Sequence, residues 1–418
     1  MNSAGIKISI PVKRLSGTVT LTGSKSESNR ALILESLSEG KVEVRNLSEA
    51  ADTVTLKNIL QPQNTEIITH NSKADVGPAG TAMRFLTAYY TLQAGEVILT
   101  GSARMKQRPI GILVDALREL GAEIEYTEND GFPPLKITGP LKQKVTQVSV
   151  KGNISSQYIS ALLLIAPKLE KGLELLIDGE LTSRPYVEMT LTMMEQAGIK
   201  HVWKQNIISI EHQNFRPSVI YVEPDWSAAS YWYAIAALSE EAKLFLPGLN
   251  GYSLQGDSKI AEIMANFGIT SQFKDGGVYI EKEFKKLDRK IFDFKKCPDL
   301  AQTVIVCCAA LGHDATFTGL ETLKIKETDR INALQTELAK IGVQLTEKNQ
   351  TYKLDCSGLD LTGNIKISTY EDHRMAMAFA PLALKMDEVE IEDHLVVEKS
   401  YPDFWSHLKM LGFNVNLS

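Results

Sequence analysis

The feature that most constrains the fold is a repeat, in which an amphipathic helical stretch ends at a glycine and a short strand, a polar turn and a second strand follow. The helix-ending glycines lie 70 to 77 residues apart, at Gly121, Gly198, Gly268, Gly342 and Gly412. Glycine is the usual residue at a left-handed helix end, so each one has a local explanation, but a recurring period indicates a repeated unit. We expect a degenerate sixth copy over residues 56–70, and therefore about six α/β units.

Turn residues between the paired strands indicate the type of sheet. Glu128 to Gly131 and Asp275 to Gly277 each separate two strand patterns, as in hairpins. This predicts antiparallel pairs and excludes a purely parallel, doubly wound sheet. Residues 1–17 alternate between polar and apolar side chains, so we expect a first strand there and not a signal peptide.

Composition excludes several classes of protein. The chain has 418 residues, 44% apolar and 23% charged, which fits two or three globular domains and neither a disordered nor a fibrous protein. A net charge of −6 argues against nucleic-acid binding. The longest apolar runs, such as 161–166 and 304–311, are too short to cross a bilayer. We therefore expect a cytoplasmic protein with no nucleic-acid or membrane partner.

The four cysteines are Cys297, Cys307, Cys308 and Cys356, and none of them forms a CxxC pair or a metal-binding spacing. We expect no metal, no cofactor and reduced thiols. Cys307 and Cys308 lie in an apolar run and are expected in the core.

Small and cationic residues recur where helices are predicted to begin: Gly23 to Arg30, Gly77 to Arg84, Arg104 to Pro109, Gly152 to Gln157, Ser183 to Tyr186, Lys326 to Arg330 and Glu371 to Arg374. Backbone amides at a helix start favour anions. Ser26 and Arg30 are four residues apart, as are Lys326 and Arg330, so each pair is expected to share a helix face. Taken singly, each motif is also compatible with simple helix capping or solvated charge.

Taken together, the cations suit substrates that carry phosphate and carboxylate groups. The set consists of Lys25, Arg30, Arg108, Lys326, Arg330, Arg374 and Lys399. Two carboxylates, Asp299 and Glu327, are the available base and acid, although Asp299 also fits a plain N-cap.

The motifs as a co-linear set resemble one family along nearly the whole chain: GSKSESNR, GPAGTAMR, RMKQRPIG, SSQ, SRPY, LQGD, CPD, KETDR, EDHRMAM and KSYPDF. They are similar to the enolpyruvyl transferases called EPSP synthases, or 3-phosphoshikimate 1-carboxyvinyltransferases. The resemblance implies an α/β fold with two domains, each built from three βαβαββ units. It places residues 1–20 with 224–418 in one domain and 21–223 in the other, with the active site in the cleft between them.

The resemblance also implies a reaction, the transfer of the enolpyruvyl group of phosphoenolpyruvate to the 5-hydroxyl of shikimate 3-phosphate. A tetrahedral intermediate forms and inorganic phosphate leaves, on the shikimate pathway to chorismate and the aromatic amino acids. The implied catalytic residues are Asp299 as base, Glu327 as acid, and Lys25. The implied ligands of shikimate 3-phosphate are Lys25, Ser26, Arg30, Ser155, Ser156, Gln157, Ser183, Asp299, Thr322 and Lys326. Those of phosphoenolpyruvate are Lys25, Gly80, Arg108, Gln157, Arg330, Arg374 and Lys399.

Three positions depart from the family pattern. Pro78 stands where the family often has Asn, Phe85 where it often has Pro, and Thr322 where relatives carry Asn. Sensitivity to the phosphoenolpyruvate mimic glyphosate therefore stays open. We expect a monomer that binds only its two small-molecule substrates.

Two alternative functions can be compared with the one that the resemblance implies. The sister enzyme that acts on UDP-N-acetylglucosamine uses a cysteine in a mobile loop of its N-terminal half, whereas the first cysteine here is Cys297 and residues 102–109 contain none. A non-catalytic anion-binding protein on the same scaffold would be expected to lack Asp299, Glu327 or Lys25, and all three are present.

Overall fold

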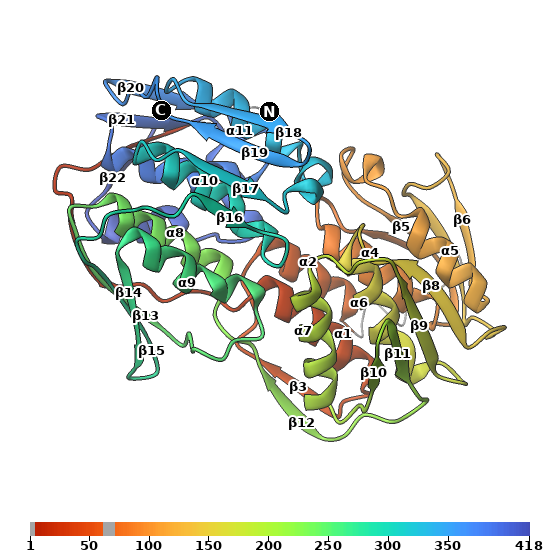
Figure 1. Ribbon diagram of the computed structural model, residues 1–418. Coiled ribbons are helices and arrows are strands. Elements are labelled where there is room, and N and C mark those ends of the chain that lie inside the picture. Colours follow the sequence, from red (N-terminus) through yellow and green to blue (C-terminus); the bar gives the residue numbers. More distant parts are fainter. Residues whose placement is uncertain (1–4, 62–71) are drawn as a thin grey trace. The chain divides into compact units, whose positions relative to one another are not determined.

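The computed structural model describes residues 5–61 and 72–418. The chain forms two compact units, which are described here one at a time (Figure 1). Unit 1 consists of Met1–Thr22 and Glu223–Ser418, and unit 2 of Gly23–Val222. The chain thus passes from unit 1 into unit 2 after Thr22 and returns after Val222.

Unit 2 contains six α-helices in its described part. They are α1 (Lys25–Leu37), α2 (Ala51–Leu60), α4 (Gly80–Tyr90), α5 (Gly111–Leu120), α6 (Ser156–Ile165) and α7 (Arg184–Gln196). Its described strands are β3 (Val42–Arg45), β4 (Ser72–Asp75), β5 (Gly95–Thr100), β6 (Glu123–Tyr126), β7 (Leu135–Gly139), β8 (Gln147–Lys151), β9 (Leu173–Asp178), β10 (Val202–Lys204), β11 (Ile207–Ile210) and β12 (Ser218–Tyr221).

Unit 1 contains the helices α8 (Trp226–Leu238), α9 (Ile260–Met264), α10 (Ala301–Ala310), α11 (Arg330–Ala339), α12 (His373–Phe379) and α13 (Phe404–Met410). Its strands are β1 (Ile6–Ser9), β2 (Arg14–Thr18), β13 (Glu241–Pro247), β14 (Ile269–Lys274), β15 (Gly277–Lys282), β16 (Ile291–Asp293), β17 (Ala315–Thr318), β18 (Gln344–Lys348), β19 (Thr351–Asp355), β20 (Asn364–Ile367), β21 (Glu388–Ile391) and β22 (Asn414–Leu417). Short 3₁₀ helices that matter below are η3 (Gly256–Lys259), η5 (Pro298–Leu300) and η6 (Glu321–Ile325).

The sheets confirm the repeat. Five four-stranded sheets share one strand order, namely β4-β5-β7-β6, β8-β9-β11-β10, β2-β13-β15-β14, β16-β17-β19-β18 and β20-β21-β1-β22. In each, the first two strands pair in parallel and the other pairs are antiparallel, as in β4-β5, β5-β7 and β6-β7. In the described residues the sixth sheet is the parallel pair β12-β3. The fold is therefore α/β with mixed sheets, and the predicted hairpins are confirmed.

The first strand predicted within residues 1–17 is confirmed as β1, and a second strand, β2, which was not predicted, begins in the same stretch. β1 pairs with β21 and β22, whereas β2 pairs with β13. Pro11 lies between them and has no N–H to donate, which separates the two strands. The start of the chain thus completes two sheets of unit 1. Of the degenerate copy expected over 56–70, α2 ends at Leu60 and residues 62–70 lie outside the described part.

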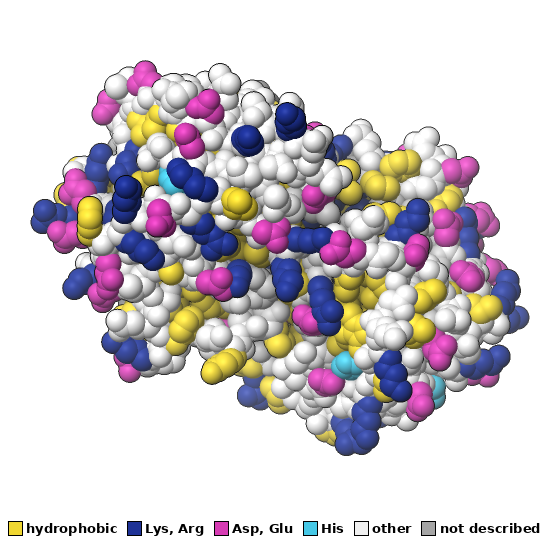
Figure 2. All heavy atoms as spheres, viewed as in Figure 1, with side chains coloured by type: hydrophobic (Ala, Val, Ile, Leu, Met, Phe, Trp, Pro, Cys, Tyr) yellow, Lys and Arg dark blue, Asp and Glu magenta, His cyan; other side chains and the backbone are white. Residues whose placement is uncertain are grey.

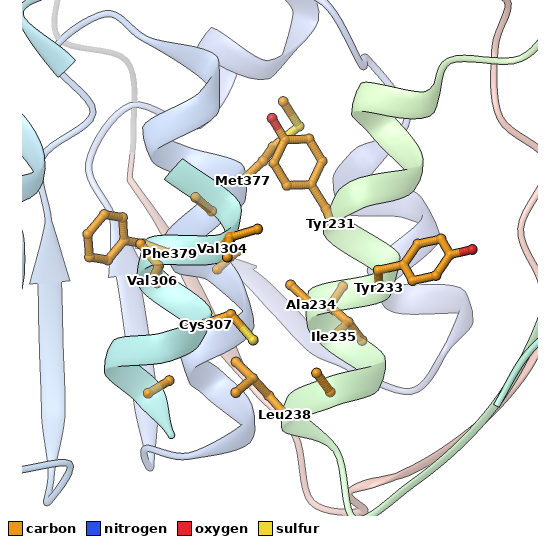
Figure 3. Packing of buried hydrophobic residues seen from close by; sticks show 14 of the residues in the cluster. Tyr231, Tyr233, Ala234, Ile235, Leu238, Val304, Val306, Cys307, Met377 and Phe379 are labelled. Atoms are coloured by element: carbon orange, nitrogen blue, oxygen red, sulfur yellow. The ribbon is translucent and has the colours of Figure 1, made fainter. Parts of the chain in front are cut away.

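Three helices form the core of each unit. In unit 2, α1, α4 and α6 contact one another, and in unit 1, α8, α10 and α12 do the same. Every residue of α8, α10 and α12 is buried except Ser227, as expected for helices that are apolar on all sides. Figure 3 shows how Tyr231 of α8 points toward Met377 of α12 beside Val304 of α10.

The thiols belong to this core. Cys307 and Cys308 are buried on α10, as predicted, and burial raises the pKa of Cys307 to about 12. Both thiols are therefore protonated and unreactive at neutral pH.

The repeated glycines end helices as predicted. Gly121, Gly198, Gly268, Gly342 and Gly412 all have positive φ, between 73° and 113°. The two-residue turn between β14 and β15 uses Asp275 and Gly276, with φ of 53° and 72°. Both are left-handed conformations, which a tight hairpin of this kind requires.

Acidic and basic side chains are interspersed on the face drawn in Figure 2, with no single basic field. Within residues 5–61 and 72–418, no helix is long and apolar enough to span a membrane.

Candidate functional site

Many of the predicted site residues lie at helix starts, and several of these helices are the core helices of the two units. In unit 2, the Gln157 side chain at the start of α6 donates to Thr81 Oγ1 at the start of α4, at 3.2 Å. In unit 1, Arg374 at the start of α12 donates through Nη2 to Ser227 Oγ at the start of α8, at 3.3 Å. Each unit therefore brings helix N-termini together at one end, where the helix dipoles and free amides favour anions.

Lys25 opens α1 and is paired with an acid that the sequence analysis missed. Its Nζ lies 3.4 Å from Asp52 Oδ2, and the Lys25 side chain is only 15% exposed. Asp52 sits in the first turn of α2, where an acidic residue is favoured by the helix dipole. No helix start was predicted at this point of the sequence, so no local signal indicated Asp52.

Arg30 lies inside unit 2 and is almost fully engaged there. Its guanidinium donates to Thr190 Oγ1, the Ser26 carbonyl, Ser160 Oγ and the Tyr186 carbonyl, at 2.7 to 3.2 Å. Ser26 and Arg30 do share a face of α1, as predicted. Burial lowers the pKa of Arg30 to about 10. Four of its five N–H groups are used within the protein, so one is left for a ligand.

Phe85, one of the departures from the family pattern, lies under the same guanidinium. The Arg30 Cζ is 5.4 Å from the centre of the Phe85 ring. The face of the Phe85 ring thus makes a cation–π contact with Arg30, at a position where the family often has the smaller Pro. Pro78 is exposed, two residues before α4 begins at Gly80.

Arg108 is a buried cation for which the described residues supply no counter-ion. It is 8% exposed, its Nε has no hydrogen-bond partner, and no ion pair of its guanidinium exists within the described residues. A Cβ at Gly80 would lie 2.6 Å from Arg108 Nη1, so the glycine lets the cation lie against the start of α4. A buried charge without a counter-ion is costly, which indicates an anion-binding position.

The remaining predicted residues of unit 2 are also at helix starts. Ser155 caps α6, its Oγ accepting from the Gln157 N–H at 3.3 Å, and Ser156 is the first helical residue. Ser183 precedes α7 with φ of 54°, and its side chain makes no cap. The left-handed backbone at Ser183 leaves its hydroxyl available for other contacts.

Arg330 is the centre of the unit 1 cluster. Its side chain, 2% exposed, is bound by three carboxylates. Nε lies 2.7 Å from Asp372 Oδ2, Nη1 3.1 Å from Asp299 Oδ1, and Nη2 2.8 Å from Glu327 Oε2. Asp372, which also caps α12 by accepting from the Arg374 N–H, was quoted within EDHRMAM but not recognised as a site residue. An Asp directly before a predicted helix was the signal for it.

Asp299 lies in η5, ahead of α10, and is not the N-cap that the alternative interpretation required, because α10 is capped at Leu300 without a side-chain bond. Its carboxylate contacts Arg330, Lys326 and Arg374 at 3.1, 3.7 and 3.1 Å. Burial alone would raise the pKa of Asp299, but Arg374, Lys326 and Arg330 together hold this pKa below its usual range.

Lys326 and Arg330 do meet, but not on a helix face, so that expectation is wrong. Lys326 follows η6 with ψ of −148°, and α11 begins only at Arg330. Asp329 caps α11, and the N-cap must be non-helical, which breaks the helical spacing. The two cations meet because both reach Asp299.

Glu327 is bound both to Arg330 and to Lys399, and so it links Lys399 to the unit 1 cluster. Lys399 Nζ lies 3.2 Å from Glu327 Oε1, and these side chains are 11% and 14% exposed. Arg374 also donates through Nη1 to the Asp299 carbonyl at 3.2 Å and to Tyr231 Oη at 3.4 Å. The Thr322 hydroxyl is buried in η6 without a hydrogen-bond partner in the described residues, which leaves it available for a ligand.

No group of three or more His, Cys, Asp or Glu side chains in the described ranges could hold a metal ion. The side chains that the two clusters do contain are suited to proton transfer, by Asp299 or Glu327, and to anion binding, by Lys and Arg.

Comparison with known proteins agrees with this chemistry. A family model described as EPSP synthase (3-phosphoshikimate 1-carboxyvinyltransferase) matches residues 10–408. A 3-phosphoshikimate 1-carboxyvinyltransferase of Bacteroides fragilis (strain YCH46) is 47% identical over 406 residues, 97% of each chain. One of Vibrio atlanticus (strain LGP32) is 37% identical over 425 residues, covering 96% of this chain and 98% of that protein.

Solved structures share the fold. EPSP synthase from Acinetobacter baumannii superposes with a TM-score of 0.76 at 22% identity, over 99% of this chain and 100% of that chain. The enolpyruvyl transferase NikO from Streptomyces tendae gives 0.73 at 14% identity, over 100% and 99%.

Proposed function

Because the chain belongs to the EPSP synthase (3-phosphoshikimate 1-carboxyvinyltransferase) family, we propose that its two clusters act together on one pair of substrates. The reaction transfers the enolpyruvyl group of phosphoenolpyruvate to the 5-hydroxyl of shikimate 3-phosphate and releases inorganic phosphate. It belongs to the shikimate pathway, which leads to chorismate and the aromatic amino acids. The proposal is that residues of both units bind the same two substrates.

Shikimate 3-phosphate is assigned to residues of both clusters. Its phosphate and hydroxyls would be bound by Lys25, Ser26, Arg30, Ser155, Ser156, Gln157, Ser183, Asp299, Thr322 and Lys326. The helix starts of α1 and α6 support this assignment, because their free amides suit a phosphate. The free Thr322 hydroxyl supports a contact from unit 1.

Phosphoenolpyruvate is assigned to the cations, with Lys25, Gly80, Arg108, Gln157, Arg330, Arg374 and Lys399 as its ligands. The unpartnered Arg108 supports this most directly, since an anion would supply its missing counter-charge. Arg374 and Lys399 supply further positive charge for a carboxylate or for the leaving phosphate.

The observation that carries the proposed mechanism is the Asp299 carboxylate among three cations. In the absence of substrate those cations make Asp299 a weak base. When substrate anions take over part of their charge, less of it stabilises the carboxylate, and Asp299 becomes basic enough to accept the 5-hydroxyl proton. Asp299 would thus become an effective base only when the substrates are bound.

Addition and elimination then follow. The freed hydroxyl oxygen bonds to the central carbon of phosphoenolpyruvate while the methylene carbon takes a proton from Glu327. The tetrahedral intermediate then expels phosphate, which takes the proton held by Asp299, and its methyl group returns a proton to Glu327, which leaves the enolpyruvyl ether and restores both carboxyl groups. Lys399, with Nζ 3.2 Å from Glu327 Oε1, stabilises the Glu327 carboxylate while it is deprotonated. We further propose that the enzyme acts as a cytoplasmic monomer.

The test is phosphate release from phosphoenolpyruvate, with shikimate 3-phosphate or UDP-N-acetylglucosamine as the acceptor, before and after chelation of divalent metals. We expect release with shikimate 3-phosphate alone, and no loss of rate on chelation. Release only with UDP-N-acetylglucosamine would replace this function by that of the sister enzyme. A rate abolished by chelation and restored by one divalent ion would show that the proposed metal-free mechanism is wrong.

A further inference from the structure

Asp257 is a buried carboxyl of unit 1 that the proposed reaction does not use. It lies in η3, within the LQGD motif, and is 3% exposed. Its Oδ2 accepts a hydrogen bond from the Ser227 hydroxyl, and its Oδ1 is buried without a hydrogen-bond partner in the described residues. A carboxyl in this state requires an explanation, because a buried polar atom without a partner is costly.

The Ser227 hydroxyl connects Asp257 to the proposed ligands of phosphoenolpyruvate. Its single proton is given to Asp257, so its lone pairs are left to accept from Arg374 Nη2, at 3.3 Å. The same Nη2 lies 3.1 Å from Asp299 Oδ2. The guanidinium is therefore held from two sides, by Asp299 directly and by Asp257 through one hydroxyl.

We propose, on the premise of the function proposed above, that Asp257 is a positioning residue that holds Arg374 through Ser227, and that it takes up a proton when phosphoenolpyruvate binds to Arg374. The carboxyl then compensates part of the charge that the incoming anion brings. This assigns to the site a further titrating group besides the two proton-transfer carboxylates.

The charged surroundings of Asp257 support the uptake of a proton. The groups that face it are Asp299 of η5, Arg374 of α12, Asp225 at the N-cap of α8, and the thiol of Cys297. Burial, followed by the Asp299 charge, raises the pKa of Asp257 to about 7, while Arg374 acts in the opposite direction.

The direction of the pH effect follows from this balance. When an anion engages Arg374, the opposing influence weakens and the pKa of Asp257 rises further. A group whose pKa rises on binding favours binding at low pH, and this advantage is lost as the pH passes above the pKa of the unliganded site. The affinity for phosphoenolpyruvate should therefore fall above about pH 7.

Asp257→Asn tests the proton uptake, because the amide keeps the shape and an acceptor oxygen but cannot titrate. The measurement is kcat/KM for phosphoenolpyruvate at saturating shikimate 3-phosphate, from about pH 6 to about pH 9. We expect the ratio of wild type to variant to fall about tenfold over this range. The phosphate group of phosphoenolpyruvate also titrates in this range, but it does so equally with both enzymes. Its effect on kcat/KM therefore cancels in the ratio of wild type to variant.

Ser227 tests the positioning. Ser227→Ala should raise KM for phosphoenolpyruvate about tenfold with little change in kcat, while Ser227→Thr, which keeps a hydroxyl, should restore KM. KM for shikimate 3-phosphate serves as the internal control for an intact unit.

Parallel pH profiles for wild type and Asp257→Asn would overturn the proton uptake, and an Ala variant with an unchanged KM would overturn the positioning role. Both results presuppose a wild-type enzyme that turns over. Absence of turnover in the wild type would count against the proposed function itself, and so the two failures are distinct.

Discussion

Arg330 fixes both groups to which proton transfer is assigned. Its guanidinium bonds Asp299 and Glu327 with its two terminal nitrogens, while Nε is bound to Asp372. A buried cation between three carboxylates is a structural element as well as a proposed ligand. Lys399, which reaches Glu327 from η8 (His394–Lys399), is the better residue for isolating the effect of charge on substrate binding.

Replacement of these two cations should therefore have different consequences. Lys399→Ala removes one charge-assisted contact, worth about 1.5 to 3 kcal/mol, so phosphoenolpyruvate should bind about ten- to a hundred-fold more weakly with little change in thermal stability. Arg330→Ala removes the cation that bonds Asp372 and one of the cations that bond Asp299 and Glu327, all of them buried or nearly so, and should also lower the free energy of unfolding by about 3 to 5 kcal/mol. Calorimetric titration and thermal melting measure both. Equal melting temperatures for the two variants would contradict the structural role of Arg330.

Replacement of Asp299 should lower turnover without weakening the binding of substrate. Asp299→Ala removes the proposed base and one negative charge from a site that binds two anions. Binding of shikimate 3-phosphate should survive or tighten, while turnover falls by about 10² to 10⁴. Titration calorimetry alongside steady-state rates shows the pattern, and Asp299→Asn controls for lost volume. If binding and rate fell in equal proportion, or if the rate were kept, Asp299 would not be the base.

At the scale of elements, each repeat supplies one buried core helix, and the five repeats with a recurring glycine also supply a helix that this left-handed glycine ends. The core helices bring their N-termini together, and the glycines turn the chain back into the sheet. Gly342 and Gly412 occupy the same place in two repeats, with φ of 73° and 91°. Their surroundings differ, because a Cβ at Gly342 would lie 2.0 Å from the Gly358 carbonyl oxygen, whereas one at Gly412 would meet nothing within 4 Å.

These two glycines form a matched pair of test positions. Gly412→Ala should cost about 1 to 2 kcal/mol, the price of a left-handed conformation for a residue with a Cβ. Gly342→Ala should cost more, since the backbone carbonyl it meets cannot move without disturbing the next strand. Urea unfolding of both variants measures the difference. Equal costs would mean that the backbone conformation alone decides the requirement for glycine at Gly342.

Patterns local in sequence were predictable and contacts between distant segments were not. The glycine period predicted the repeats, and the turn residues predicted hairpins such as the one at Asp275. Pairing of β1 with β21 and β22 depends on partners that lie near the other end of the chain, such as Ile391 and Leu417 for Ile6, which no local pattern records. The same reason explains why Asp52 and Asp372 were missed: their importance comes from Lys25 and Arg330, which the fold brings to them.

For the candidate site, motif spacing predicted which cations gather but not how they are bound. Arg30 was expected at the ligand, and the structure shows most of its donors used inside unit 2. The helical spacing of Lys326 and Arg330 was misleading, because the N-cap at Asp329 separates them. Asp257 was quoted only as part of a motif, since burial and a missing partner are visible only in three dimensions.

At the scale of the whole molecule, the proposed ligands are divided between two units that the chain connects at two points, after Thr22 and after Val222. Lys25 and Arg108 belong to unit 2, and Lys326 and Lys399 to unit 1. If both sets bind one pair of substrates, the site is complete only when the units come together around them. Binding of shikimate 3-phosphate should then make the molecule more compact.

Small-angle X-ray scattering with and without saturating shikimate 3-phosphate tests this claim most directly, with Lys25→Ala as a control that weakens binding from unit 2. The account predicts a smaller radius of gyration for the wild-type protein with ligand, and a change in the variant only at higher ligand concentration. An unchanged radius of gyration, at a ligand concentration where calorimetry shows full binding, would contradict a site built from both units.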